Sequence, residues 1–102
     1  MKVLVAYQSF DHAIRSFVRE DANYLMIVHT LEPEELVESH VHTDANEWIV
    51  VRDGHFIVTI DGEETGFSQE CEWIVIPIAK GQQHSLMART KVSYFVLRDK
   101  II

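Results

Sequence analysis

Short runs of β-forming residues, broken by turn residues at intervals of roughly eight to twelve positions, constrain the fold of this chain more than any other feature. The strands expected from these runs lie at 3–7, 24–31, 47–52, 55–60, 63–67, 73–77, 84–88 and 92–98. No long stretch shows the periodicity of a helix. The pattern is typical of an all-β protein, either a sandwich or a small antiparallel β-barrel, with at most one short N-terminal helix.

The N-terminal segment 9–18 allows two interpretations. Phe10, Ala13 and Ile14 fall on one helical face and Ser9 is available as an N-cap, although the alternation along 13–18 would also suit a strand. A short helix or an irregular turn is the preferred interpretation. The strand that follows, 24–31, is rich in β-formers and is expected to be buried.

Composition narrows the class of protein. Of the 102 residues, 47% are hydrophobic and 25% are charged, which suffices for one core, so we expect a single domain over residues 1–102. The formal net charge is -7 without a basic cluster, so neither nucleic acid nor a membrane is an expected partner. No apolar stretch is long enough for a signal peptide or a bilayer span. The lone cysteine, Cys71, suits a reducing compartment, and we therefore expect a cytoplasmic protein.

The dipeptide Asp53-Gly54 separates two expected strands and predicts a two-residue hairpin, because a type I′ turn needs positive φ at both central residues. The register that follows pairs Arg52 with His55, Val51 with Phe56, Ile49 with Val58 and Glu47 with Ile60. The dipeptide Asp61-Gly62 predicts a second turn of the same kind, which leads into 63–67.

One face of this predicted hairpin is apolar apart from a single carboxylate, and we expect it to form the barrel interior. Its members are Glu47, Ile49, Val51, Phe56, Val58 and Ile60. The opposite face is mixed and carries Trp48, Val50, Arg52, His55, Ile57 and Thr59. Because several residues of that second face are large and apolar, another sheet or a partner subunit is expected to cover it.

His40 and His42 are two residues apart, so on an extended strand both imidazoles point to the same face. Glu47 follows after the short loop 43–46. A buried carboxylate is costly unless it is neutralised or bound to a cation, and a metal ion shared with the two histidines would meet that need. A polar surface loop is the alternative, which a lone pair of histidines would favour.

The spacing of these residues matches a known family. His40-x-His42, four residues, Glu47, six residues and Gly54 reproduce the core of the first motif of the cupin superfamily, whose members are small β-barrels. Residues that align with the second cupin motif are Pro77, Gly81 and His84. The chain thus resembles small single-domain cupins over roughly residues 31–88. The loop before His84 is two residues longer than the family pattern, and Glu34, Cys71, Glu72 and Ala88 also depart from that pattern.

The resemblance implies an antiparallel β-barrel of jelly-roll type and a metal site formed by His40, His42, Glu47 and His84. Three histidines and one carboxylate suit manganese, iron, nickel, zinc, cobalt or copper, and no thiolate joins them. Such a ligand set leaves coordination positions open for Lewis-acid or redox chemistry. The resemblance also implies a homodimer, with which outward-facing Trp48, Val50 and Ile57 are compatible.

Three functions are compatible with that site. The first is a metal-dependent enzyme that acts on a small organic substrate, of dioxygenase, isomerase or decarboxylase type. The second is a non-catalytic module that binds or senses a small ligand with a bound metal. The third is a scaffold whose metal only stabilises the fold. A resemblance in fold alone does not identify the substrate.

The other polar residues carry weaker expectations. His12 and His55 are expected at the surface, and His29 is either a core residue or a pocket wall. Cys71 is expected to be packed rather than reactive, because no basic neighbour is evident to activate its thiol. Residues that could contact a ligand, although the spacing singles out none of them, are Gln82, Gln83, Arg89 and Tyr94.

Overall fold

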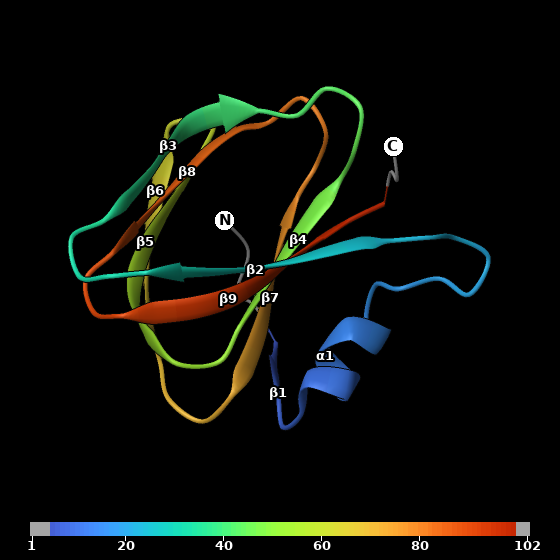
Figure 1. Ribbon diagram of the computed structural model, residues 1–102, viewed down its shortest axis with the longest axis horizontal. Coiled ribbons are helices and arrows are strands. Elements are labelled where there is room, and N and C mark those ends of the chain that lie inside the picture. Colours follow the sequence, from blue (N-terminus) through green and yellow to red (C-terminus); the bar gives the residue numbers. More distant parts are fainter. Residues whose placement is uncertain (1–4, 100–102) are drawn as a thin grey trace.

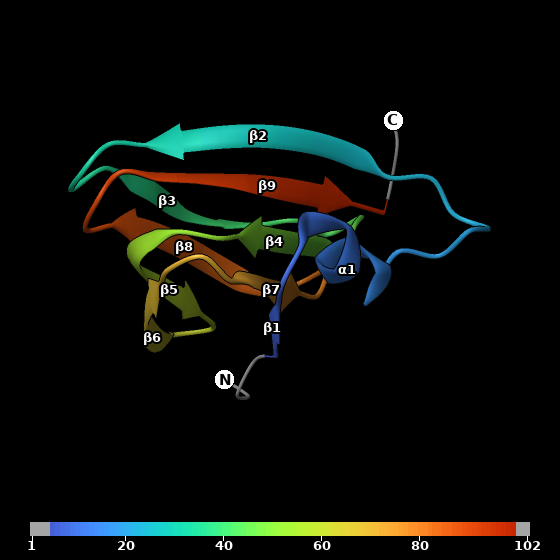
Figure 2. The ribbon, with the colours of Figure 1, turned by 90° about the horizontal axis from the view of Figure 1, so that it is seen from below.

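The structure is a computed structural model that describes residues 5–99, and it consists of two antiparallel sheets packed face to face (Figures 1 and 2). Its elements are β1 (Ala6–Tyr7), α1 (Phe10–Arg15), β2 (Leu25–Leu31), β3 (Leu36–Val41), β4 (Glu47–Val51), β5 (Gly54–Ile60), β6 (Glu63–Gln69), β7 (Trp73–Ile78), β8 (Gln83–Ala88) and β9 (Val92–Arg98). One sheet has the order β1-β7-β4-β9-β2 and the other the order β3-β8-β5-β6. The predicted all-β jelly-roll barrel with one short helix is confirmed. Within residues 5–99, no helix has the length and apolar character that a membrane crossing needs.

The main core fills the space between the two sheets. It includes Ile49 and Val51 of β4 together with Phe56 and Val58 of β5, all of which are at most 6% exposed. These residues belong to the face that the sequence placed in the barrel interior, so that prediction is confirmed. Alternation along each strand fixes which side chains point inward, whichever strand lies beside it.

The predicted hairpin between β4 and β5 is wrong. β4 pairs with β7 and β9, whereas β5 pairs with β6 and β8, so the turn at Asp53-Gly54 carries the chain from one sheet to the other. Gly54 has a φ of 130°, and a Cβ there would lie 2.5 Å from Cγ2 of Val92. Glycine is thus required by the close approach of β9 rather than by a type I′ turn.

The second predicted turn is confirmed. Asp61 and Gly62 have φ angles of 49° and 82°, and they join β5 to β6 with Ile60 opposite Glu63. Positive φ at both central residues is what a type I′ turn requires. The two Asp-Gly dipeptides therefore serve different purposes: the first connects the sheets and the second makes a hairpin.

The expectation that 24–31 forms a buried strand is wrong. β2 lies at the edge of its sheet and pairs with β9 (Figure 2), and Leu25, Met26 and Val28 are 41%, 52% and 58% exposed. Apolar composition indicated a strand correctly, but it could not reveal that no helix or second sheet within residues 5–99 covers these side chains. Of the first expected strand, 3–7, positions 3 and 4 lie outside the described residues.

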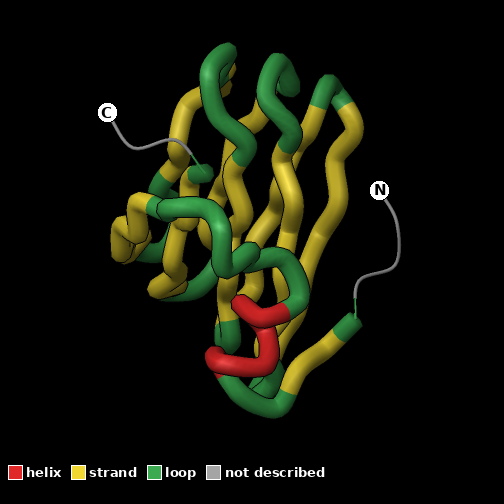
Figure 3. Tube along the Cα trace, turned by 90° about the vertical axis from the view of Figure 1, so that its right-hand side faces the viewer, coloured by secondary structure: helices red, strands yellow, loops and turns green. Residues whose placement is uncertain are grey.

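The outer face of β4 is covered by the N-terminal segment of the chain itself (Figure 3). Ser9 caps α1 by accepting a hydrogen bond from the backbone N–H of His12 at 3.1 Å, which confirms the predicted helix. Ala13 packs against Val50, and both are fully buried. The ring of Phe17 stacks on Trp48 with centroids 4.7 Å apart. This covering replaces the sheet or partner subunit that the sequence suggested for Trp48 and Val50.

Candidate metal centre

The four residues predicted as metal ligands meet at one end of the barrel. His40 lies in β3 opposite His84 of β8, His42 directly follows β3, and Glu47 is the first residue of β4 in the facing sheet. One donor atom from each residue can be chosen so that all four lie within 4.8 Å of one another. The cluster could therefore hold a metal ion.

Two of the histidines are oriented by backbone carbonyl groups. Nδ1 of His40 lies 2.8 Å from the carbonyl oxygen of Glu38, and Nδ1 of His84 lies 3.1 Å from that of Gln82. A carbonyl oxygen can only accept, so each Nδ1 carries the hydrogen and each Nε2 is the ring nitrogen left for the cluster. Metal-binding histidines are commonly held in this way, with the other ring nitrogen bonded to a carbonyl group.

Glu47 is 4% exposed and its two oxygen atoms have different neighbours. Oε1 lies 3.2 Å from Nε2 of both His42 and His84, whereas Oε2 accepts a hydrogen bond from Nε of Arg98 at 2.7 Å. Burial would raise the pKa of this carboxyl group, but hydrogen bonds with His84 and Arg98 outweigh burial and lower the pKa to about 2. The carboxylate is thus ionised at neutral pH although it is buried.

The two histidines beside Glu47 differ in their affinity for a proton. Burial lowers the pKa of His42. Burial acts in the same direction on His84, but the hydrogen bond to Glu47 overcomes it and the pKa of His84 is raised. The hydrogen bond between Nε2 of His84 and Oε1 of Glu47 thus favours the protonated form of His84 relative to that of His42.

Arg98 is the residue of the site that the sequence reasoning missed. It lies directly opposite Glu47 in the pairing of β9 with β4. Its Nη2 lies 3.4 Å from Nε2 of His42, in addition to the bond from Nε to Glu47. The alternation of inward and outward side chains along β9 could have identified it. Arg98 shares the inward face with Tyr94 and Val96, which are buried.

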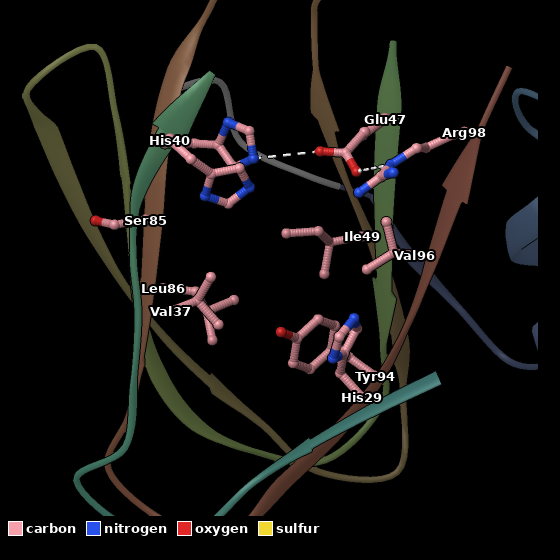
Figure 4. Close-up of a pocket in the computed structure, with 11 residues that line it drawn as sticks. His29, Val37, His40, Glu47, Ile49, Ser85, Leu86, Tyr94, Val96 and Arg98 are labelled. Carbon is pink, nitrogen blue, oxygen red and sulfur yellow. Dashed lines mark hydrogen bonds and ion pairs between the residues drawn. The ribbon is translucent and has the colours of Figure 1, made fainter. Parts of the chain in front are cut away.

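A cavity of about 80 Å³ extends from the cluster into the barrel (Figure 4). Its aliphatic walls are Val37, Ile49, Leu86 and Val96, with Ser85 beside them. At the end away from Glu47 and Arg98, the ring of Tyr94 stacks on that of His29 with centroids 5.6 Å apart. Of the two interpretations of His29, the structure supports the pocket wall. Burial raises the pKa of Tyr94, so its hydroxyl group stays protonated.

The loops that carry the ligands are tied together by Asn46. Its backbone N–H donates to Oδ1 of Asp99 at 2.9 Å, and its side-chain oxygen accepts from the backbone N–H of Lys80 at 3.0 Å. The backbone N–H of Gly81 also donates to the carbonyl oxygen of His42 at 2.8 Å. The loop before His84, although longer than the cupin pattern, is therefore anchored to the loop between His42 and Glu47.

The remaining candidates lie elsewhere. His12 and His55 are exposed, as predicted. Cys71 is also exposed, so the expectation of a packed cysteine is wrong, because Cys71 occupies a turn with a φ of 61°. Of the four residues that could contact a ligand, Tyr94 lines the cavity, whereas Gln82, Gln83 and Arg89 are not among the residues that line it.

A two-sheet antiparallel barrel with a histidine and carboxylate cluster at one end defines the cupin class of fold, and solved structures support that assignment. A predicted oxalate decarboxylase from Thermotoga maritima is 18% identical, with a TM-score of 0.66 over 76% of this chain and 66% of that chain. An RmlC-like cupin from Shewanella frigidimarina is 13% identical, with a TM-score of 0.66 over 76% and 67%. Salicylate 1,2-dioxygenase from Pseudoaminobacter salicylatoxidans, in complex with gentisate, is 20% identical, with a TM-score of 0.62 over 74% and 20%.

These likenesses show that the chain has the cupin fold, as the sequence resemblance implied. No family profile matches the sequence, and no curated protein matches it closely enough to count as a relative.

Proposed function

We propose that this protein is a metal-dependent cupin enzyme that holds one divalent transition metal ion with His40, His42, Glu47 and His84. The observation that carries the proposal is the convergence of four donor atoms within 4.8 Å, from β3 and the residue after it, from β8 of the same sheet and from β4 of the other sheet. An ionised carboxylate together with three histidines, two of them oriented by backbone carbonyl groups, is a donor set that such a metal accepts.

A metal bound there would supply Lewis-acid or redox chemistry beside the cavity. The chain itself contributes positioning and the exclusion of water. Ile49, Leu86 and Val96 present aliphatic groups to the cavity, which keeps a small organic molecule in a surrounding of low polarity. Tyr94 offers a protonated hydroxyl group at the end away from Glu47.

Reactions of the dioxygenase, isomerase or decarboxylase type fit this proposal. The structural neighbours include a predicted oxalate decarboxylase and a salicylate dioxygenase, both named for reactions of small organic acids. Their identity to this chain is at most 20%, so they support the reaction class through the fold alone.

A non-catalytic module that binds or senses a small ligand is the second candidate. One observation favours it: among the described residues that line the cavity, Glu47 is the single carboxyl group, and it is held by Arg98 and the histidines. General acid–base chemistry would then depend on Tyr94 or His29. Turnover measured with wild type and with Tyr94→Phe separates the two candidates.

Metal analysis of purified variants tests the proposed site. The double variant His40→Ala/His42→Ala removes two ligands, and His12→Ala/His55→Ala removes two exposed histidines as a matched control. We expect about one metal ion per chain in the wild type and in the control, and a loss of at least tenfold in metal affinity in the first variant. Equal metal content in all three proteins would refute the ligand assignment.

The homodimer that the resemblance implies also stays part of the proposal, although its surface differs from the one first suggested. β2 has its second edge unpaired among the described strands, and Met26 and Val28 on it are 52% and 58% exposed. An exposed apolar edge strand tends to associate with strands of other chains, because its backbone N–H and C=O groups are unpaired on one side. Pairing of β2 with β2 of a second copy would satisfy these backbone groups and cover the apolar side chains.

A further inference from the structure

We propose that the cavity binds a small carboxylate with a compact aliphatic body, and that Arg98 receives the carboxylate beside the metal position. This inference rests on the proposed function, because it takes a metal ion to be bound by His40, His42, Glu47 and His84. It adds the chemical class of the small molecule that binds and a role for Arg98. Neither follows from the four residues that would bind the metal.

The charge of the loaded site is the first argument. A divalent ion and the guanidinium of Arg98 bring three positive charges, and Glu47 supplies one negative charge. Glu47 and His84 are 4% and 6% exposed and the side chain of Arg98 is 30% exposed, so water compensates the remaining two charges only in part. Glu47 is the single carboxylate among the described cavity residues, and the nearby carboxylate of Asp99 is bonded to Asn46. An anionic ligand would restore the balance.

The hydrogen-bond donors of Arg98 are the second argument. Nε is committed to Oε2 of Glu47 at 2.7 Å, whereas Nη2 lies 3.4 Å from Nε2 of His42. If His42 coordinates a metal ion through Nε2, that lone pair can no longer accept a hydrogen bond from Nη2. A guanidinium N–H is then left beside the metal position without that acceptor. A carboxylate oxygen is the partner that a guanidinium group binds most strongly.

The walls of the cavity define the rest of the ligand. Below Arg98 and Glu47 in Figure 4 lie Ile49 and Val96, and Leu86 and Val37 face them from the other sheet. A ligand with many hydroxyl groups would leave them unpaired against these aliphatic side chains, which costs free energy for each group. The volume of about 80 Å³ limits the body to a few carbon atoms. A short or branched aliphatic acid meets both conditions.

Binding of two matched probes to the cobalt-loaded protein tests the inference. Isobutyrate and isobutyramide have the same branched body, and only isobutyrate is charged at pH 7. Cobalt content is measured first, and each probe is then titrated by calorimetry and by the visible absorption of cobalt. We expect the wild type to bind isobutyrate at least about tenfold more tightly than isobutyramide.

Variants separate the contribution of Arg98 from that of the metal, which by itself also favours a carboxylate. Arg98→Met should reduce the preference for isobutyrate about tenfold, whereas Arg98→Lys, which keeps the charge without the two separate guanidinium donors, should retain only part of it. Arg15→Met, which removes an exposed guanidinium on α1, should leave the preference unchanged. Thermal unfolding and cobalt content of each variant show whether a change reflects lost structure.

The outcomes distinguish this inference from the proposed function. If the wild type retains no cobalt, the proposed function is refuted and this inference falls with it. If cobalt is bound but both probes bind equally, or if the preference is the same in Arg98→Met, only this inference is overturned.

Discussion

Arg98 holds one oxygen of Glu47 and leaves the other facing the histidines: Nε of Arg98 donates to Oε2 at 2.7 Å, and Oε1 lies 3.2 Å from Nε2 of His84. The two residues are directly opposite each other in neighbouring strands β4 and β9. The carboxylate is thereby oriented before any ligand arrives, which is the arrangement that a single-oxygen metal ligand needs.

The same pairing predicts how stability depends on pH in the metal-free protein. The pKa of Glu47 falls from 4.5 to about 2 on folding, so its ionised form contributes stability above pH 4.5. That contribution is lost as the pH falls through about 2. Glu47→Gln should cost about 2 kcal/mol at pH 6 and progressively less as the pH is lowered. Urea unfolding of both proteins between pH 2 and 6 measures the difference, and a difference independent of pH would contradict the account.

Gly54 predicts a second stability effect. Gly54→Ala places a Cβ 2.5 Å from Cγ2 of Val92 at a φ of 130°, so it should destabilise the protein by about 3 kcal/mol. Gly62→Ala is the matched control, because Gly62 has a φ of 82° with no atom within 4 Å of its Cβ position. The control should cost about 1 kcal/mol, from backbone strain alone. Equal losses in the two variants would mean that contact with Val92 contributes nothing.

Asn46 should affect the metal site without touching it. Asn46→Ala removes the side-chain bonds to Asp99 and to the backbone of Lys80, so the loops that carry His42 and His84 lose a shared anchor. We expect metal affinity to fall about tenfold, as measured by competition with a chelator. Asn23→Ala, at an exposed position near the start of β2, is the control and should leave the affinity unchanged. An unchanged metal affinity in Asn46→Ala would show that the loops carrying His42 and His84 keep their positions without the hydrogen bonds of Asn46.

The edge of β2 should govern self-association. Val28→Lys puts a charge on the exposed edge strand, and we expect it to weaken the proposed dimer at least about tenfold. Val18→Lys, which changes a residue that is 37% exposed outside the sheets, is the control. Light scattering after size-exclusion chromatography measures the mass of each protein over a range of concentrations. A wild type that stays monomeric at high concentration would refute the dimer.

The sequence predicted which side chains cluster better than it predicted how the strands pair, and the reason is physical. His40, His42 and Glu47 lie close together in the chain, and alternation places Glu47 inward whichever strand is its neighbour. Strand pairing, in contrast, depends on contacts between distant segments. Only the fold reveals that the Asp53-Gly54 turn joins the two sheets instead of closing a hairpin, and that Val92 lies close to Gly54.

Two further differences have similar causes. Apolar composition identified β2 as a strand, but its exposure is decided by its place at the edge of the sheet. Arg98 was missed because an arginine at the end of a strand usually reaches solvent. Its inward direction follows from alternation with Tyr94 and Val96, and its partner Glu47 is 51 positions away in the chain. A residue pair this distant becomes evident only when β9 and β4 are placed side by side.

The central claim is that four named side chains hold one metal ion, and anomalous diffraction tests it most directly. Crystals grown with a divalent transition metal would be measured on both sides of its absorption edge. The account predicts one anomalous peak per chain, bonded to Nε2 of His40 and His84, to a ring nitrogen of His42 and to one oxygen of Glu47, whose other oxygen stays on Arg98. A peak elsewhere, or none at full metal concentration, would contradict it.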